Sequence, residues 1–260
     1  MTHNFLKRMA PAIALAIGAS LSGCNVSIDM SGFDGVPLGE LDTSGDAPSG
    51  ILLAGPDAVV ITDGSEFAVT VDGDPDAVEA VRFDREGEAL EIGRDTDVFD
   101  GRGSATIRVT MPAPKELGIA GSGKIEANTI ASEAVIEIAG SGDVVVESVE
   151  AERLGIEIAG SGEVIASGTA TNLDVEIFGS GDVKLANLTA DTVSVEIAGS
   201  GNVEIASDGT VDAEIAGSGD IVVTGSATCS VDTAGSGSLT CKPAATADAA
   251  EADREEAAAE

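Results

Sequence analysis

Seven serines, each held between two glycines, are the residues of this sequence whose spacing first suggests chemistry. They recur between residues 121 and 237, at Ser122, Ser141, Ser161, Ser180, Ser200, Ser218 and Ser236. A serine becomes a nucleophile when a neighbouring general base, most often a histidine, takes its proton. The single histidine of the chain is His3, which lies far from the repeats in the sequence. The triplets also lack the lysine and the strand-loop-helix context of a phosphate-binding loop. They therefore predict a repeated structural turn rather than repeated catalytic centres.

Acidic residues recur at two fixed positions relative to these serines. Four residues before the serine the chain carries Glu137, Glu157, Glu176, Glu196 and Glu214. Two residues after the serine it carries Asp143, Glu163, Asp182 and Asp220. Carboxylates on neighbouring turns could supply the oxygen ligands that Ca²⁺ prefers, so these nine side chains are candidate cation-binding residues. The alternative is a pair of solvated acidic faces, because like charges about 4.8 Å apart in water repel by only about 0.9 kcal/mol. The G-G-x-G-x-D calcium nonapeptide is absent, and the sequence predicts no cofactor and no specific metal site.

The spacing of the serines predicts the fold that must position these side chains. Successive serines are 18 to 20 residues apart, and the residues around them alternate with period two. Three columns are apolar in nearly every repeat: Ile119 to Thr233, Leu117 to Val231, and Ile125 to Leu239. Such columns face inward when short strands stack on the strands of the next turn. We predict an all-β fold, a single-stranded parallel β-helix (β-solenoid) with about 19 residues per coil, whose corners use the glycines' tolerance of positive φ.

The segment before the repeats predicts further strands. Between about residues 51 and 111, runs such as "AVVIT", "EFAVTV", "AVEAVRF", "EALEIG" and "ATIRVTMP" are separated by Gly, Asp and Pro. Each run is typical of a strand of about five residues. One folded domain is therefore expected over residues 51–242, with the Gly-Ser-Gly repeats in residues 117–241.

The N-terminal residues are typical of an export signal. Lys7 and Arg8 precede an apolar run of roughly a dozen residues, which is too short to span a bilayer comfortably. The run ends in "LSGC", which resembles the lipobox of bacterial lipoproteins. The resemblance implies a signal peptide at 1–23, a lipid on Cys24 that anchors the chain to a membrane, and, because Asn25 rather than Asp follows, the outer membrane. The alternative is an ordinary signal peptide. Residues 24–50, rich in Gly, Ser, Asp and Pro, predict a flexible tether.

Two further cysteines and an acidic tail complete the organisation. If Cys24 is acylated, Cys229 and Cys241 remain as a pair that could form a disulfide across the last repeats in an oxidising compartment. Two buried thiols are the alternative. Residues 243–260 are acidic and Ala-rich and predict a disordered tail.

Composition restricts the function classes. The net charge of −33 opposes binding to nucleic acid. Polysaccharide-cleaving solenoids need aromatic platforms and a basic residue near the substrate, whereas aromatic residues make up only 2% of this chain. A carbohydrate-active, lyase-like enzyme therefore stays a minor alternative.

A longer motif resembles a known family. The run "VTMPAPKELGIAGSGKI", followed by repeated "GSGDV" turns, resembles the putative auto-transporter adhesin head GIN domain family over roughly residues 51 to 242. The resemblance implies a parallel β-helix in the bacterial envelope and brings no catalytic residue. We expect a non-catalytic, adhesion-like module with an unknown protein or glycan partner. A Ca²⁺- or glycan-binding surface protein is the alternative, and the sequence leaves the oligomeric state open.

Overall fold

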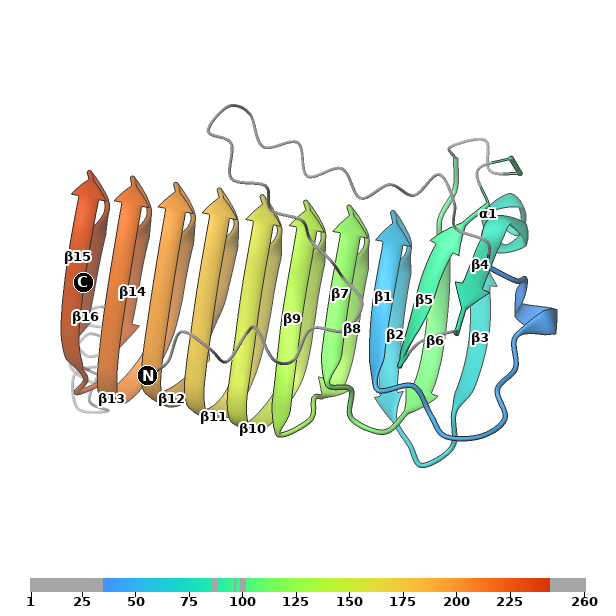
Figure 1. Ribbon diagram of the computed structural model, residues 1–260, viewed down its shortest axis with the longest axis horizontal. Coiled ribbons are helices and arrows are strands. Elements are labelled where there is room, and N and C mark those ends of the chain that lie inside the picture. Colours follow the sequence, from blue (N-terminus) through green and yellow to red (C-terminus); the bar gives the residue numbers. More distant parts are fainter. Residues whose placement is uncertain (1–34, 86–87, 96, 99–101, 244–260) are drawn as a thin grey trace, which may run out of the picture.

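The protein is a β-solenoid whose successive coils stack into a rod (Figure 1). The computed structural model describes residues 35–85, 88–95, 97–98 and 102–243. The solenoid has about 7 turns of about 19 residues, which confirms the predicted fold class. No helix within the described ranges is long and apolar enough to cross a membrane.

The regular part of the rod consists of parallel strands in register. Its first three strands are β7 (Glu116–Gly121), β8 (Lys124–Thr129) and β9 (Glu133–Gly140). Four long strands then wrap around most of a coil each: β10 (Asp143–Gly160), β11 (Glu163–Gly179), β12 (Asp182–Gly199) and β13 (Asn202–Gly217). Strand β14 (Asp220–Thr224) follows β13, and the last coil consists of β15 (Thr228–Gly235) and β16 (Ser238–Lys242), which stack on β13 and β14. All ladders between these strands are parallel.

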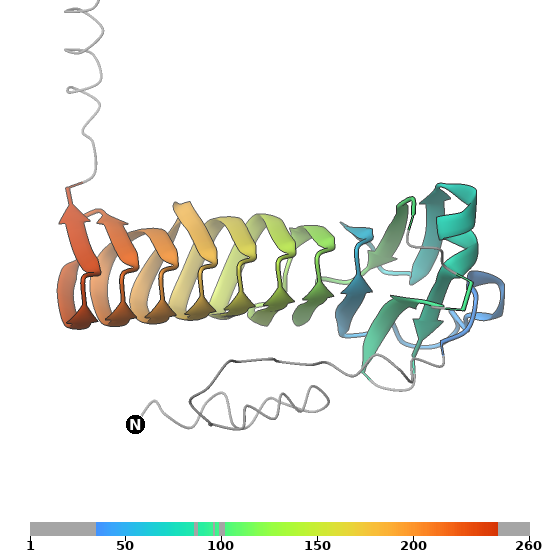
Figure 2. The ribbon, with the colours of Figure 1, turned by 90° about the horizontal axis from the view of Figure 1, so that it is seen from above.

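Two sheets face each other across the interior, one on each side of the Gly-Ser-Gly corner (Figures 1 and 2). The strand segments before the corner form the front sheet, which includes β7, β9 and β15. The segments after the corner form the back sheet, which includes β8, β14 and β16. Alternating aliphatic side chains fill the space between the sheets, and Ile158, Ile177 and Ile197 are completely buried. The predicted inward columns are thus buried from β7 to β14.

The two glycines of each triplet are required by stacking of the main chain. Gly160 has a φ of 139°, and a Cβ there would lie 2.1 Å from the Gly140 carbonyl oxygen of the preceding coil. A Cβ on Gly162 would lie 2.5 Å from the Gly142 carbonyl oxygen. Between them, the Ser161 N–H donates a hydrogen bond of 2.8 Å to the Gly140 carbonyl. Each corner therefore rests directly on the backbone of the corner below, with no room for a side chain.

One coil precedes the repeats that the serines mark. Strands β1 (Gly50–Gly55) and β2 (Ala58–Asp63) pair in parallel with β7 and β8. Their corner is Gly55-Pro56-Asp57, and Gly55 is in register with Gly121. This coil is not predicted as a repeat from the sequence, because it lacks the Gly-Ser-Gly triplet.

The N-terminal end of the rod is closed by strands that reverse direction. Strands β5 (Ala89–Arg94) and β6 (Ala105–Met111) add a parallel layer to β1 and β2. On that layer β4 (Val81–Asp84) and β3 (Ala68–Gly73) lie antiparallel. We call β3–β6 and the helix α1 (Pro75–Ala80) the cap. In Figure 2 the cap forms the end of the rod opposite β15 and β16.

The helix in the cap corrects one prediction. Residues 77–83 were expected to form a strand, but residues 75–80 form α1 and the strand β4 begins only at Val81. Pro75 occupies the first turn, where its fixed φ and missing N–H are tolerated. Ala77 and Ala80, three residues apart, are both completely buried. The buried residues of this segment therefore have helical spacing. The pattern of Ala and Val in the run 77–83 instead suggested a strand.

The described part of the expected tether is also different from the prediction. Residues 35–49 were expected to be flexible, but they lie against the cap. Val36 and Phe83 exchange two main-chain hydrogen bonds of 2.8 Å, and a short 3₁₀ helix, η2 (Leu38–Glu40), follows. The Arg85 side chain donates to the carbonyls of Asp42 and Ser44 at 2.6 and 3.0 Å. The Gly, Ser and Asp residues of this segment form turns whose carbonyls accept hydrogen bonds from Arg85. Local composition does not reveal this distant partner.

A buried ion pair joins the first coil to the cap. The Arg94 Nε donates to Asp57 Oδ2 at 2.6 Å, and the Ala105 N–H donates to Asp57 Oδ1 at 2.7 Å. The two charged side chains are only 5% and 1% exposed. Asp57 stands where later coils have the second glycine, and a side chain fits because no Gly-Ser-Gly corner lies against it on the cap side.

Candidate interaction surfaces

The seven serines lie exposed along one edge of the rod, as corners do. The second glycine of each triplet is buried in the first six corners, and Gly237 of the last corner is half-buried. The hydrogen bonds that join successive corners come from the serine N–H groups, for example Ser180 to the Gly160 carbonyl at 2.8 Å. Hydroxyl groups thus take no part in stacking these corners. The geometry is that of a repeated structural turn.

The glutamates four residues before the serines form one in-register column on the front sheet. Glu137 pairs with Glu157, Glu157 with Glu176, Glu176 with Glu196, and Glu196 with Glu214. Neighbouring members therefore stand one strand spacing apart, about 4.8 Å. The structure brings all five predicted carboxylates together on one face. We call them the glutamate column.

Exposure along the glutamate column is uneven, although the sequence predicted an exposed ladder throughout. Glu137, Glu157 and Glu176 are half-buried, whereas Glu196 and Glu214 are exposed. Burial, followed by the charges of Glu157 and Glu116, raises the pKa of Glu137 to about 7. Burial also raises the pKa of Glu157. The part of the column nearer the cap therefore holds its negative charge less readily.

The second acidic column lies on the back sheet, and its members have partners within the protein. Lys184 forms an ion pair with Glu163. The Asn202 Nδ2 donates to Asp182 at 2.9 Å, and the Ser238 hydroxyl donates to Asp220 at 2.6 Å. Asp143 stands in register with Lys124. The lysines offset part of the negative charge of this column, and the hydrogen bonds occupy carboxylate oxygens that a cation would otherwise use.

Neither column forms a convergent ligand set. Across the described residues, no group of three or more His, Cys, Asp or Glu side chains is arranged to hold a metal ion. Members of one column point outward side by side, and the two columns lie on different faces of the rod. The nine candidate cation-binding residues are thus surface carboxylates in this structure.

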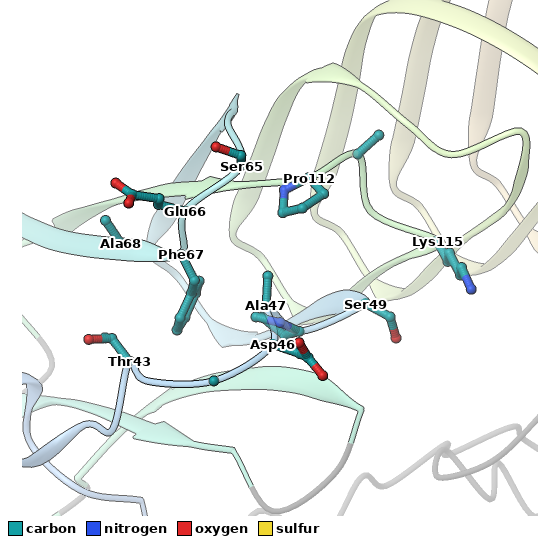
Figure 3. A pocket seen from close by; sticks show the side chains of 13 residues that line it. Thr43, Asp46, Ala47, Ser49, Ser65, Glu66, Phe67, Ala68, Pro112 and Lys115 are labelled. Carbon is teal, nitrogen blue, oxygen red and sulfur yellow. The ribbon is translucent and has the colours of Figure 1, made fainter.

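A cavity of about 750 Å³, which the sequence does not predict, lies beside the cap (Figure 3). Its walls come from the segment expected to be a tether, from the β2–β3 connection and from the β6–β7 connection. The lining residues are Thr43, Gly45, Asp46, Ala47, Pro48, Ser49, Ser65, Glu66, Phe67, Ala68, Pro112, Ala113 and Lys115. The sequence carried no signal for it beyond an isolated Phe67, because the three segments are distant along the chain.

The polar groups around this cavity make structural contacts between the segments that form its walls. The Arg85 guanidinium lies 4.9 Å from the centre of the Phe67 ring and holds the 42–46 segment. The Ser49 hydroxyl donates to the Glu88 carbonyl at 3.2 Å, so it is not directed at the Lys115 amine. Figure 3 shows Lys115 at one side, apart from Asp46 and Glu66. We find no nucleophile paired with a base among the lining residues.

The cysteines fall in two regions. Cys229 and Cys241, 12 residues apart, are joined by a disulfide that connects β15 to β16. Cys24, the predicted signal peptide at 1–23 and the part of the predicted tail from residue 244 onward lie outside the described residues.

Comparison with known proteins places the chain in a family. A family model described as "Putative auto-transporter adhesin, head GIN domain" matches residues 47–227. Since the match spans more than half of the chain, the protein belongs to this family, and the resemblance seen in the sequence is confirmed. No curated protein matches the chain.

Solved structures with low sequence identity share the fold. A putative adhesin from Bacteroides fragilis has a TM-score of 0.66 at 20% identity, covering 78% of this chain and 94% of that chain. A putative adhesin from Parabacteroides merdae has a TM-score of 0.57 at 19% identity, with the same coverage. A putative lipid binding protein from Parabacteroides distasonis has a TM-score of 0.57 at 22% identity, covering 75% and 93%. The family and the two adhesins are described as adhesins, not as enzymes.

Proposed function

We propose that this head GIN domain protein is a non-catalytic, adhesion-like interaction module of the bacterial cell envelope. The family to which it belongs and two of its structural neighbours, described as adhesins, support an adhesion-like role in the envelope. The histidine-free repeats, and the lack of a paired nucleophile and base in the cavity beside the cap, support the absence of catalysis.

The observation that carries this proposal is the in-register repetition of outward positions along the rod. Each coil offers the same outward position one strand spacing from the last, as the glutamate column does. A polymer or a repeated protein surface would therefore meet similar contacts at every coil. Contacts that are weak singly give high avidity when several form at once.

We propose further that an acyl chain on Cys24 anchors the module in the outer membrane. Cys24 lies 11 residues before residue 35, the first described residue, which enters the rod at the cap. The anchor would therefore be joined to the capped end, leaving the last coil distal. One structural neighbour is named a putative lipid binding protein. Here we assign membrane contact to the acyl chain, since aliphatic side chains fill the solenoid interior.

The anchor is tested by labelling cells that express the full chain with a radioactive or clickable fatty acid. We expect the wild-type chain to be labelled and to enter the detergent phase, and Cys24→Ala to do neither. Cys229→Ser/Cys241→Ser is the matched control and should be labelled normally. Equal labelling of the Cys24→Ala chain would contradict lipid attachment at Cys24.

The interaction role is tested by attachment of cells displaying the full chain to arrayed envelope polysaccharides and glycoproteins. We expect saturable attachment that Glu157→Gln/Glu176→Gln/Glu196→Gln alters. The control triple variant Asp143→Asn/Asp182→Asn/Asp220→Asn changes the opposite sheet. Loss of an arrayed acidic polysaccharide, with release of unsaturated products that the glutamate variant abolishes, would instead establish an enzyme. A chain that binds none of the arrayed molecules would contradict the proposal.

The Ca²⁺-binding alternative predicts a different outcome in thermal unfolding. The full chain is unfolded in EDTA, in millimolar Ca²⁺ and in millimolar Mg²⁺ at matched ionic strength. We expect equal midpoints in Ca²⁺ and Mg²⁺, because the carboxylates do not converge and those of the back sheet already have partners. A rise specific to Ca²⁺ would replace our proposal by a calcium-dependent surface protein.

A further inference from the structure

Among the described strands, none is laid upon the last coil of the rod. Strand β15 pairs with β13 and strand β16 pairs with β14, each along one edge only. In the part of the chain that the structure describes, no strand pairs with their outer edges. Such edges present rows of main-chain N–H and C=O groups that favour pairing with a further strand.

Interior positions of the last coil are open as well. Val231 is 45% exposed, although Ala213, the residue in register with it on β13, is 4% exposed. Leu239 is half-buried, whereas its partner Ile221 is completely buried. Within the described residues, the end of the rod is therefore a core layer without a covering layer.

The disulfide makes this end a fixed surface. Cys229 is in register with the buried Val211, and Cys241 is in register with the buried Val223. Both cysteines thus occupy interior positions of the last coil. The covalent bond between them holds the front and back edges at one spacing. An edge that is prevented from fraying loses less conformational entropy when a partner binds.

The charge of the rod changes at this coil. The preceding coil carries Asp212, Glu214 and Asp220 on its strands. In register with Asp212 and Asp220, the last coil has Ser230 and Ser238. Strands β15 and β16 carry one acidic residue, Asp232, and one basic residue, Lys242, so their net charge is zero. The column on the front sheet continues as Asp232, in register with Glu214, but the charge of Lys242 offsets it. A layer of zero net charge is one that an equally acidic chain can approach.

We propose that the open end formed by β15 and β16 docks against the same end of a second copy of this chain. The edges of the two copies would pair antiparallel around a two-fold axis, with Val231 and Leu239 of each copy covered by the other. The interface would use one patch twice and so close on itself. Because the cap blocks the other end of each rod, assembly would stop at two copies.

The chain's own C-terminal tail is a less suitable cover. Residues 244–260 contain no Val, Ile, Leu or aromatic residue, so they have no side chain to fill the layer above Val231 and Leu239. They carry six acidic residues and one basic residue, an unfavourable composition for a strand added to a sheet. The interface between two copies involves only about 15 residues per chain, fewer than a standard interface, so we expect micromolar or weaker affinity.

The test is sedimentation velocity of the full chain in non-ionic detergent over a concentration series, with electron microscopy of the faster species. We expect a monomer–dimer equilibrium that added NaCl strengthens, because both copies are acidic. The dimers should be rods of about twice the monomer length. Val231→Arg should weaken association at least tenfold. Val98→Arg is the matched control, since Val98 is 46% exposed and lies at the cap end.

A second variant tests the interface without the risk that Val231→Arg disturbs the folding of the last coil. Lys242 is exposed, and Lys242→Glu changes the net charge of β15 and β16 from zero to −2 without touching the interior. We expect it to weaken association at low salt and to recover in high salt. Monomers at every concentration, dimers indifferent to both variants, or rods associated side by side would each overturn the proposal. Dimers that form only after residues 244–260 are deleted would show that the tail covers this end.

Discussion

The two ends of the rod face the same physical problem and have different structures. At the cap, β3 and β4 run antiparallel over the outer edges, and the buried Asp57–Arg94 pair joins the cap to the first coil. At the other end, a disulfide joins β15 to β16, and no described strand covers their outer edges. A stack of coils has no intrinsic stop, so each end needs a device of its own. Here one end is covered and the other is only prevented from fraying.

The covered end requires an unusual path of the chain. The segment β3–β6 follows β1 and β2 in the sequence but lies on the side of them away from β7. The chain then returns so that β7 stacks on the opposite edge of β1. The cap and the repeats therefore both pack on the first coil. Unfolding of the cap would expose the outer edges of that coil. At the open end, unfolding of the last coil would expose only the coil before it, because the last coil contacts a single neighbour.

The largest effect is expected from breaking the ion pair at the covered end. Asp57→Ala leaves the Arg94 charge buried and removes the acceptor of the Ala105 N–H. We expect a loss of about 3–5 kcal/mol in the free energy of unfolding, measured by urea denaturation. The control is Glu133→Gln, which breaks the exposed 2.8 Å pair with Arg153 and should change stability by less than about 0.5 kcal/mol. A similar, small loss in both variants would show that the cap does not depend on this pair.

The next effect compares a middle corner with the corner at the open end. Gly160→Ala forces a side chain onto the Gly140 carbonyl at positive φ and should reduce the free energy of unfolding by about 2–4 kcal/mol. Gly235→Ala makes the same clash with Gly217 but should cost less, because no coil within the described residues lies beyond it and the corner can shift.

The control for these glycines lies on the same strand as Gly160. A Cβ on Gly155 would be 3.7 Å from Val135, an ordinary contact, so Gly155→Ala should be neutral or stabilise by up to about 1 kcal/mol. Urea denaturation of the three variants measures the differences. Equal losses at residues 160 and 235 would mean that the last coil is held as rigidly as the middle of the rod.

Removing the disulfide should loosen the open end without affecting the covered one. The bond closes a loop of about a dozen residues, for which about 2–3 kcal/mol of stabilisation is typical. In Cys229→Ser/Cys241→Ser we expect amide hydrogen exchange to accelerate in β15 and β16 and to stay unchanged in β1 and β2. Loss of protection along the whole rod would contradict the independence of the two ends.

The smallest effect concerns the glutamate column, which is half-buried toward the cap and exposed toward the open end. Because the pKa of Glu137 is raised to about 7 in the folded protein, the folded state binds its proton more tightly than the unfolded state. Stability should therefore fall as pH rises from about 4.5 to 7. Glu137→Gln, which cannot ionise, should stabilise by about 1 kcal/mol at pH 8, after allowance for solvent screening, and by nothing at pH 4.

The matched change at the exposed part of the same column is Glu214→Gln. It should alter the thermal midpoint only slightly at either pH, because Glu214 is solvated. Both variants are measured by thermal unfolding at pH 4 and pH 8. A pH-independent effect of Glu137→Gln would show that the position responds to shape rather than to charge.

The sequence by itself determined the repeated part of the molecule. Period-two alternation and the recurrence of Gly-Ser-Gly identified the solenoid, the coil length and the two acidic columns, because every coil repeats the same local requirements. The columns Ile119 to Ile215 could be assigned to the interior for the same reason. The family could also be recognised from the sequence, since its motif lies in the strand and corner at the start of the repeats.

Tertiary structure decided what happens where repetition stops. Asp57 in a glycine position, the helix at Pro75–Ala80 and the packing of residues 35–49 all depend on partners tens of residues away, such as Arg94 and Arg85. The exposure of Val231 likewise depends on the missing layer beyond it, not on its own neighbours in sequence. Local patterns encode contacts that recur at a fixed spacing, whereas ends are built from contacts that occur once.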